Sequence, residues 1–141
     1  MPTRNASATW EGKLQGGNGS FQGESGAIGG SYSFGSRFGD AGGSNPEELL
    51  AAAEAACFSM ALSLGLEKRG ATPERVHTDA ACTIEKVGEG FEITGIRLRT
   101  RVRATGIDEA GFREVAEATK AGCPVSKALS AVNIELDAAL E

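Results

Sequence analysis

The longest apolar run in the chain predicts its central helix. Alanine and leucine dominate the residues that follow Asn45 and Pro46. Asparagine is a favoured N-cap, and proline suits the first position of a helix. The run continues to Lys68 or Arg69 and meets Gly70, a residue type that readily adopts the left-handed conformation after a helix. Apolar residues cover more than one stripe of this helix, so we expect it to be surrounded on most sides.

Two segments with alternating apolar and polar residues predict long strands after this helix. In the first, residues 75–86, the alternating residues include Cys82, which we expect to face the core. Glycines at residues 88–90 then turn the chain into the second segment, residues 91–104. The apolar phase of the second segment slips at Gly95, which predicts a β-bulge there.

The polar face of the second strand carries arginines at alternate positions. They are Arg97, Arg99, Arg101 and Arg103. We interpret this face as solvated, with an anion-binding site as the less favoured alternative. Further along, Asp108 predicts the N-cap of a helix that ends at Gly122. A short helix over residues 124–129 and a last strand over residues 133–140 complete the prediction.

Glycine is concentrated in the N-terminal third of the chain. Most of the 20 glycines lie in residues 12–43. The cluster at residues 16–19 predicts a hairpin turn between strands near residues 6–11 and 20–25. We expect an irregular segment over residues 29–44. No phosphate-binding glycine motif is present, so a nucleotide site is not expected.

The order of predicted elements is two strands, a helix, two strands, two helices and a strand. With hairpin-like connections, this order predicts an α+β fold with an antiparallel sheet. The length fits one domain over residues 1–141. The net charge of −5 and the pI near 5.0 argue against nucleic acid as a partner. Glu54 interrupts the apolar run, which we assign to a core helix and not to a membrane span. No signal peptide is recognisable, so we expect a cytoplasmic protein.

Two of the three cysteines indicate redox chemistry. Cys57 lies deep in the apolar run, and Cys123 stands directly before Pro124. A thiol in front of a helix-starting proline is in a position that favours the thiolate. Cys57 lies too far from the start of its helix to benefit from the dipole, so we expect burial to raise its pKa unless an arginine or lysine reaches it. A thiol peroxidase needs two such thiols that react in sequence.

Other kinds of chemistry fit the sequence poorly. His77 is the only histidine, and it lies on the polar face of a strand, so neither a zinc site nor a Cys-His hydrolase is favoured. The cysteines have no C-x-x-C spacing, and no G-x-S-x-G motif is present. We therefore expect no metal and no cofactor, and we assign Cys82 to packing.

Three segments of the chain carry a family resemblance. SNPEEL at residues 44–49, AACFSMAL at residues 55–62 and AGCPVS at residues 121–126 resemble the OsmC/Ohr family of organic hydroperoxide reductases. The likeness extends over essentially the whole chain. It implies a peroxidase of oxidative-stress defence that forms a homodimer, with antiparallel sheets wrapped around paired central helices and active sites at the subunit interface. It also implies that Cys57 is the peroxidatic cysteine and Cys123 the resolving one.

Two further site residues follow from the same resemblance. The Ohr branch carries its active-site arginine in the first hairpin, where residues 13–19 contain none. The OsmC branch carries it in the loop before the central helix, and Arg37 fits that pattern. The family glutamate matches Glu47. The resemblance implies that Arg37 holds Cys57 as a thiolate and that Glu47 orients Arg37. It also implies that a dithiol reductant of dihydrolipoyl type reduces the disulfide.

Helix geometry adds the expectation of a site shared between subunits. Glu47 and Cys57 are ten residues apart, which in a straight helix is roughly 15 Å along the axis and roughly 80° around it. We expect Arg37 and Glu47 of one chain to meet the cysteines of its partner. The apolar residues expected to favour bulky organic hydroperoxides over hydrogen peroxide are Phe34, Phe38, Leu49, Leu50, Phe58 and Met60. A non-catalytic thiol redox sensor or a small-hydrophobe-binding protein on the same fold is the alternative.

Overall fold

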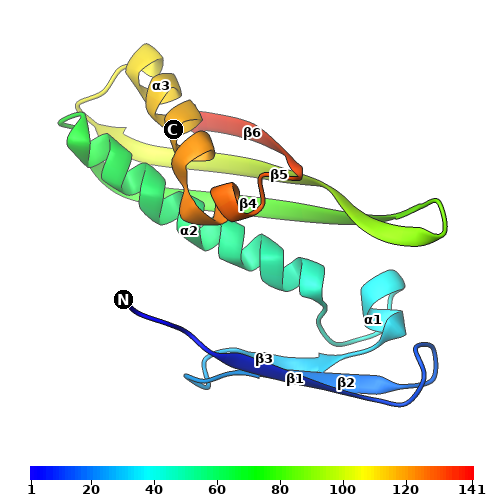
Figure 1. Cartoon of the computed structure of the whole chain (residues 1–141). Coiled ribbons are helices and arrows are strands. Elements are labelled where there is room, and N and C mark those ends of the chain that lie inside the picture. The colour runs from blue at the N-terminus through cyan, green and yellow to red at the C-terminus, as the bar shows by residue number, and fades with distance from the viewer. The chain divides into compact units, whose positions relative to one another are not determined.

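Figure 1 shows the protein as a computed structural model that describes all residues from 1 to 141. The chain forms two compact units, residues 1–49 and residues 50–141. Each unit contains a three-stranded sheet together with helical segments. The predicted α+β class is therefore confirmed, whereas the expectation of one domain over residues 1–141 stays a prediction.

The first unit is built on an antiparallel sheet with the strand order β1-β2-β3. Its strands are β1 (Ala6–Glu11), β2 (Asn18–Gly23) and β3 (Gly29–Tyr32), and a short helix follows, α1 (Phe34–Phe38). The predicted hairpin is confirmed, with its second strand starting two residues earlier than expected. The irregular segment predicted for residues 29–44 is wrong over its first ten residues, which form β3 and α1.

Aromatic packing explains why a glycine-rich segment forms the third strand. The Tyr32 ring lies 5.4 Å from the Trp10 ring and 6.1 Å from the Phe21 ring, measured between centroids. Gly19 lies beneath them, and a Cβ atom at this position would come within 2.6 Å of the Tyr32 ring. The glycine thus allows the rings to approach the sheet, a cross-strand effect that local sequence patterns do not reveal.

The predicted central helix is confirmed as α2 (Pro46–Lys68). At its start, the Glu48 backbone N–H donates to Asn45 Oδ1 at 2.8 Å, so Asn45 caps the helix as expected. At its end, Gly70 adopts a φ of 83°. The Ala71 N–H donates to the Leu66 carbonyl at 3.0 Å, which completes a Schellman motif.

The second unit is built on a sheet with the order β4-β5-β6. The long strands β4 (Thr72–Val87) and β5 (Gly90–Thr105) are antiparallel. Their register shifts where Thr83 pairs with Gly95 and Ile84 pairs with Ile93, so the predicted bulge at Gly95 is confirmed.

The prediction of a purely antiparallel sheet is wrong for this unit. β6 (Asn133–Leu140) runs parallel to β5, with Ile96 opposite Ile134. Two helices, α3 (Glu109–Gly122) and α4 (Pro124–Ala128), connect β5 to β6. They return the chain to the part of β5 around Gly95, where the pairing of β6 with β5 begins at Asn133. A connection of this length permits parallel pairing, which a hairpin does not.

The hydrophobic core of the second unit lies between this sheet and the helices α2 and α3, which cover the same face of the sheet (Figure 1). Its fully buried side chains include Phe58, Leu62, Leu66, Leu98, Val102 and Phe112. Cys82 packs against this core from β4, as predicted. A polar link crosses the same layer, because Ser59 Oγ donates to Thr78 Oγ1 at 2.8 Å.

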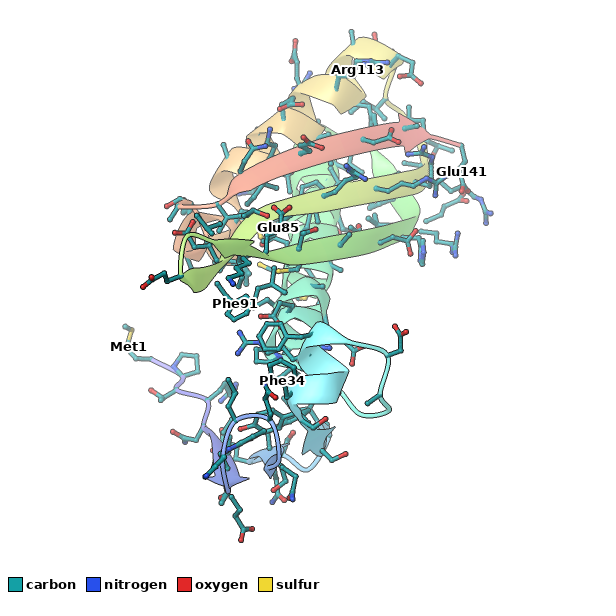
Figure 2. The ribbon with its side chains drawn as sticks, turned by 90° about the vertical axis from the view of Figure 1, so that its right-hand side faces the viewer. Met1, Phe34, Glu85, Phe91, Arg113 and Glu141 are labelled. Carbon is teal, nitrogen blue, oxygen red and sulfur yellow. The ribbon has the colours of Figure 1, made fainter.

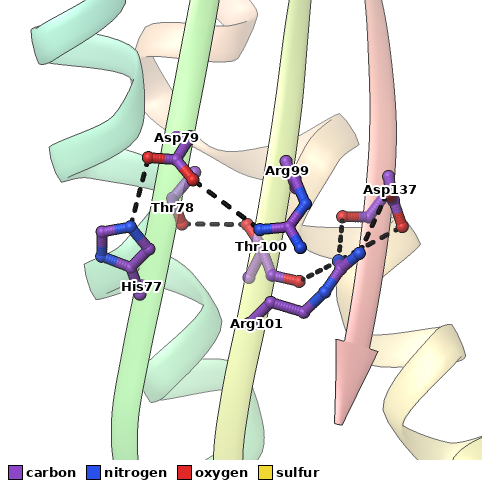
Figure 3. A network of polar contacts seen from close by, with 7 residues as sticks. All are labelled: His77, Thr78, Asp79, Arg99, Thr100, Arg101 and Asp137. Carbon is purple, nitrogen blue, oxygen red and sulfur yellow. Dashed lines mark hydrogen bonds and ion pairs between the residues drawn. The ribbon is translucent and has the colours of Figure 1, made fainter. Parts of the chain in front are cut away.

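The opposite face of the sheet is the charged face expected from the arginine pattern, and Figure 2 shows Glu85 projecting from it. Arg101 Nη2 lies 3.1 Å from Asp137 Oδ2, and Arg99 Nη1 lies 3.9 Å from Asp79 Oδ2 (Figure 3). The other two arginines also have acidic partners on neighbouring segments. His77 is on this face too, 3.2 Å from Asp79. The positive charge is thus compensated, which agrees with the interpretation as a solvated face.

The length and apolar composition of α2 would allow it to cross a membrane, and 22% of its most apolar stretch is buried in one chain. The core helix of a soluble protein meets the same criteria. In the second unit, α2 supplies Phe58, Leu62 and Leu66 to the core, and its Ser59 hydroxyl bonds to the sheet. These contacts favour its predicted role as a core helix.

Candidate active site

Two of the predicted site residues, Cys57 and Cys123, are in contact. Their Sγ atoms lie 3.0 Å apart, and both cysteines are free thiols. Cys57 is partly buried on α2, and Cys123 is buried between α3 and α4. A disulfide has an S–S length of about 2.05 Å, so these sulfur atoms need to approach by only about 1 Å to form one.

The position of Cys123 is determined by the end of α3 and the start of α4. The Cys123 N–H donates to the Thr119 carbonyl at 2.8 Å, which closes α3. The Cys123 carbonyl accepts from the Lys127 N–H at 2.9 Å, which opens α4 after Pro124. Cys123 is therefore the N-cap residue of α4, directly before the helix-starting Pro124. Its side chain makes no capping hydrogen bond and contacts Cys57 instead.

The surroundings of Cys57 raise the pKa of its thiol. Burial is the main cause, and the neighbouring Cys123 thiol and the Glu54 carboxyl add to the rise in pKa. The Val125 backbone N–H donates to Cys57 and acts in the opposite direction. None of these groups is a cation, so the predicted need for a cation from elsewhere in the fold stands. Val125 could not be predicted as a site residue, because the first turn of α4 meets Cys57 only after folding.

The other two predicted site residues, Arg37 and Glu47, form an ion pair in the first unit. Arg37 Nη2 lies 2.7 Å from Glu47 Oε1, and Arg37 Nε donates to both carboxylate oxygens at 3.1 and 3.2 Å. The Glu47 side chain is 6% exposed and that of Arg37 is 36% exposed. A buried carboxylate that engages one edge of the guanidinium in this way holds it in a defined orientation.

A network of serine and asparagine side chains holds Arg37 in place. Ser33 and Ser36 form a capping box that starts α1. Ser36 Oγ also donates to the Ser44 carbonyl at 2.7 Å, and Asn45 Nδ2 donates to the Ser36 carbonyl at 2.9 Å. These bonds attach α1 to the start of α2, so Arg37 and Glu47 belong to one rigid arrangement.

Aromatic side chains form a cavity beside Arg37. Its volume is about 240 Å³, and its lining residues are Trp10, Leu14, Tyr32, Ser33, Phe34, Arg37 and Phe38. Phe34, at the start of α1 (Figure 2), lies 4.9 Å from Phe38 between ring centroids, and the Arg37 guanidinium lies 5.4 Å from the Phe38 ring centroid. A cavity lined mainly by apolar side chains, with one cation at its wall, suits an apolar molecule that carries a polar group.

The predicted apolar surface is only partly found at this cavity. Phe34 and Phe38 line it as expected, whereas Phe58 is fully buried in the core of the second unit and its predicted substrate role is wrong. Trp10 and Tyr32 also line the cavity and were missed, because their rings meet only in the folded sheet. Glu54 was missed as well, because in the sequence it only interrupts the apolar run. It is fully buried, and its Oε1 accepts from the Ser126 hydroxyl.

Comparison with known proteins identifies the family of the chain. Residues 39–137 match the family model described as OsmC-like protein. The chain belongs to the OsmC family. It is 47% identical over 131 residues to peroxiredoxin OsmC of Escherichia coli (strain K12), a match that covers 92% of this chain and 91% of that protein.

Two further comparisons extend this result. The OsmC-family chain is 32% identical over 87 residues to the organic hydroperoxide resistance protein of Xanthomonas axonopodis pv. citri (strain 306), covering 61% of this chain and 59% of that protein. Its fold matches the crystal structure of an organic hydroperoxide resistance protein OsmC from Legionella pneumophila with a TM-score of 0.78, 22% identity and 99% of both chains covered. The predicted family and the predicted enzyme class, a cysteine-based peroxidase, are thereby confirmed.

Proposed function

We propose that this chain reduces organic hydroperoxides to alcohols in oxidative-stress defence, with Cys57 as the peroxidatic cysteine and Cys123 as the resolving one. The observation that carries the proposal is the 3.0 Å separation of the two free Sγ atoms. Relatives named peroxiredoxin and organic hydroperoxide resistance protein support the same activity.

The reaction has two steps on the enzyme. The Cys57 thiolate attacks the outer oxygen of the hydroperoxide, the O–O bond breaks, and the alkoxide leaves as an alcohol after taking up a proton. Cys57 becomes a sulfenic acid. The Cys123 sulfur then attacks the Cys57 sulfur, and the hydroxyl group leaves as water with the Cys123 proton. An external dithiol reduces the resulting disulfide by exchange and returns both thiols.

Arg37 supplies the cation that Cys57 lacks. Glu47 engages Nε and Nη2 of the guanidinium, which leaves the Nη1 edge for a thiolate or for the oxygen of a peroxide. Contact with this edge lowers the pKa of Cys57 and stabilises the negative charge that develops on the leaving oxygen. The aromatic cavity beside Arg37 accepts the organic part of the substrate.

The continuity of α2 supports a site that is shared by two subunits. The helix runs from Pro46 to Lys68 and contains no proline after its first residue, and Glu47 precedes Cys57 by ten residues in its sequence, an interval that can be converted to a length with the rise of an ideal helix. That interval is about 15 Å along the axis, too long for one small site. Arg37 and Glu47 therefore act on the partner subunit's Cys57.

The exposed side of α2 supports a homodimer. Residues spaced by four along the helix form one exposed stripe, and they are Ala52, Ala56, Met60 and Leu64. Met60 is 77% exposed and Leu64 is 50% exposed. The buried residues Glu54, Phe58, Leu62 and Leu66 lie on the other side of the helix. A stripe of alanine and larger apolar residues allows a second copy of α2 to pack closely against it.

A steady-state peroxidase assay tests the proposal. With cumene hydroperoxide and excess dithiothreitol or dihydrolipoamide, the purified protein should give many turnovers per Cys57. One molecule of alcohol should form for each molecule of dithiol oxidised. Oxidation of one equivalent followed by no turnover with either dithiol would support the redox-sensor alternative. The cytoplasmic location and the physiological reductant of dihydrolipoyl type belong to the same proposal, and three cysteines that form no disulfide suit a reducing compartment.

A further inference from the structure

A buried carboxyl group lies next to the two cysteines without a role in the reaction described above. Glu54 is 0% exposed, although it lies in the most apolar part of α2. Its Oε1 accepts a hydrogen bond from Ser126 Oγ, and its Oε2 has no hydrogen-bond partner. Burial of a carboxyl group is costly even with one hydrogen bond, so its presence calls for an explanation.

Glu54 and Ser126 form a second contact beside that of the cysteines. Glu54 precedes Cys57 by three residues on α2, and Ser126 follows Cys123 by three residues on α4. Residues three apart lie on the same face of a helix. The two segments therefore meet in antiparallel fashion, with one contact between the sulfur atoms and the other between the carboxyl group and the hydroxyl group.

The segment that carries Cys123 needs such support. α4 has only five residues, and a helix of this length has little stability of its own. Ser126 is 4% exposed, so the hydroxyl lies inside the protein and its bond to Glu54 is shielded from water. The contact also carries a disadvantage, because the Glu54 carboxyl raises the pKa of Cys57 and so disfavours the reactive thiolate.

We propose that Glu54 and Ser126 are positioning residues for disulfide formation, and that their hydrogen bond holds Cys123 against Cys57. The inference rests on the proposed roles of the two cysteines. In the step concerned, the Cys123 sulfur forms a bond to the sulfur of the Cys57 sulfenic acid, the S–O bond breaks, and water leaves with the Cys123 proton. A second hydroperoxide competes for the same sulfenic acid, which it oxidises to sulfinic acid while it is itself reduced to an alcohol.

The hydrogen bond decides between these two outcomes through proximity. A fixed neighbouring thiol reacts at a high effective concentration, which falls when the segment that carries it becomes mobile. Loss of the bond should therefore increase the sulfinic acid formed at a given peroxide concentration. In Ser126→Ala, which keeps the Glu54 carboxyl, the first step, attack of Cys57 on the peroxide, should keep its rate.

Three variants separate the hydrogen bond from the charge of Glu54. Ser126→Ala removes the donor. Glu54→Met removes the acceptor and fills the space with an apolar side chain, so it breaks the same hydrogen bond without leaving the buried carboxyl unpaired. Glu54→Gln removes the charge but keeps an oxygen that accepts from Ser126. Ser59→Ala is the matched control, because it removes another hydroxyl bond of α2, to Thr78, without touching α4.

The measurement is made on full-length reduced protein titrated with cumene hydroperoxide. Mass spectrometry gives the ratio of Cys57 sulfinic acid to Cys57–Cys123 disulfide. We expect Ser126→Ala and Glu54→Met to raise this ratio by roughly three- to tenfold, the effect of one hydrogen bond. Glu54→Gln and Ser59→Ala should keep the wild-type ratio.

Each contrary result has a distinct meaning. A wild-type ratio in both Ser126→Ala and Glu54→Met overturns the inference while the proposed function stands. A raised ratio in Glu54→Gln also overturns it, because the charge and not the hydrogen bond would then matter. If the wild-type protein forms no disulfide between Cys57 and Cys123, the proposed function itself fails.

Discussion

Cys57 and Cys123 are separated by 66 positions in the chain, yet their sulfur atoms lie 3.0 Å apart. The contact depends on the end of α3, which places Cys123 at the junction with α4, and on the packing of that junction against α2. The thiols meet in the reduced state, so no large movement is needed before the disulfide forms. The two cysteines differ in burial and in their proposed roles, so each can be tested by itself.

The first prediction distinguishes the three cysteines by activity. Cys57→Ser should abolish peroxidase turnover, because a hydroxyl is too weak a nucleophile to replace the thiolate. Cys82→Ser should keep most of the activity, because Cys82 packs against the core from β4. Initial rates with cumene hydroperoxide and dithiothreitol provide the measurement. Turnover of Cys57→Ser near the wild-type rate would show that another residue attacks the peroxide.

The second prediction concerns the product of the first turnover. One equivalent of hydroperoxide should convert the reduced protein to a Cys57–Cys123 disulfide within one chain. In Cys123→Ser, excess peroxide should instead oxidise Cys57 to sulfinic acid, because no resolving thiol is in reach. Peptide mass spectrometry under non-reducing conditions distinguishes these products. A linkage to Cys82 as the main product would contradict the pairing.

The third prediction concerns the pKa of Cys57. Alkylation requires the thiolate, so its rate rises with pH through the pKa of the thiol. The Glu54 carboxyl raises the pKa of Cys57, together with burial and the Cys123 thiol. Glu54→Gln removes the charge, so the pH at half-maximal alkylation of Cys57 should fall. Iodoacetamide labelling at Cys57, followed by peptide mass spectrometry, provides the pH profile.

Glu67→Gln is the matched control for this pH profile. Glu67 lies on the same helix but is exposed, so water screens its charge. Its substitution should leave the alkylation profile of Cys57 unchanged. A profile that is unchanged in Glu54→Gln as well would show that the carboxyl of Glu54 does not act on the thiol.

The fourth prediction concerns the substrate. The cavity beside Arg37 is lined by Trp10, Tyr32, Phe34 and other residues, so it gains affinity from burial of apolar surface at roughly 25 cal/mol per Å². Cumene hydroperoxide should therefore have a higher kcat/KM than hydrogen peroxide. Phe34→Ala should lower kcat/KM for cumene hydroperoxide by roughly three- to tenfold, the value of one aromatic contact, and have little effect with hydrogen peroxide. Equal loss with both peroxides would assign Phe34 to folding alone.

Local patterns predicted most of the elements and singled out two of the four candidate residues, Cys57 and Cys123. Asn45, Pro46 and Gly70 mark the ends of α2 because capping is a local effect. The phase slip at Gly95 marks the bulge because strand alternation is local too. Arg37 and Glu47 were found through the family resemblance, and their contact in the first unit agrees with it.

Contacts between distant segments could not be predicted from these patterns. The third strand of the first unit forms because Tyr32 packs on Trp10, and the parallel pairing of β6 depends on the return of the chain through α3 and α4. The bond between Glu54 and Ser126 joins residues 72 positions apart. The sequence around Glu54 does not indicate its hydrogen-bond partner, because α2 and α4 come into contact only in the folded protein.

The last prediction concerns the shared site. If Arg37 and Glu47 act on the partner subunit's Cys57, neither Cys57→Ser nor Arg37→Ala should be active as a homodimer. A heterodimer of the two variants has one site that lacks both groups and one site that keeps both. When equal amounts are mixed under conditions of subunit exchange, about half of the dimers should be heterodimers. Each heterodimer has one intact site of two, so activity should recover to roughly a quarter of the wild-type value. Native mass spectrometry verifies the exchange. Activity that stays at zero after confirmed exchange would show that Arg37 acts on the cysteine of its own chain, because every heterodimer would then carry each defect in a separate site.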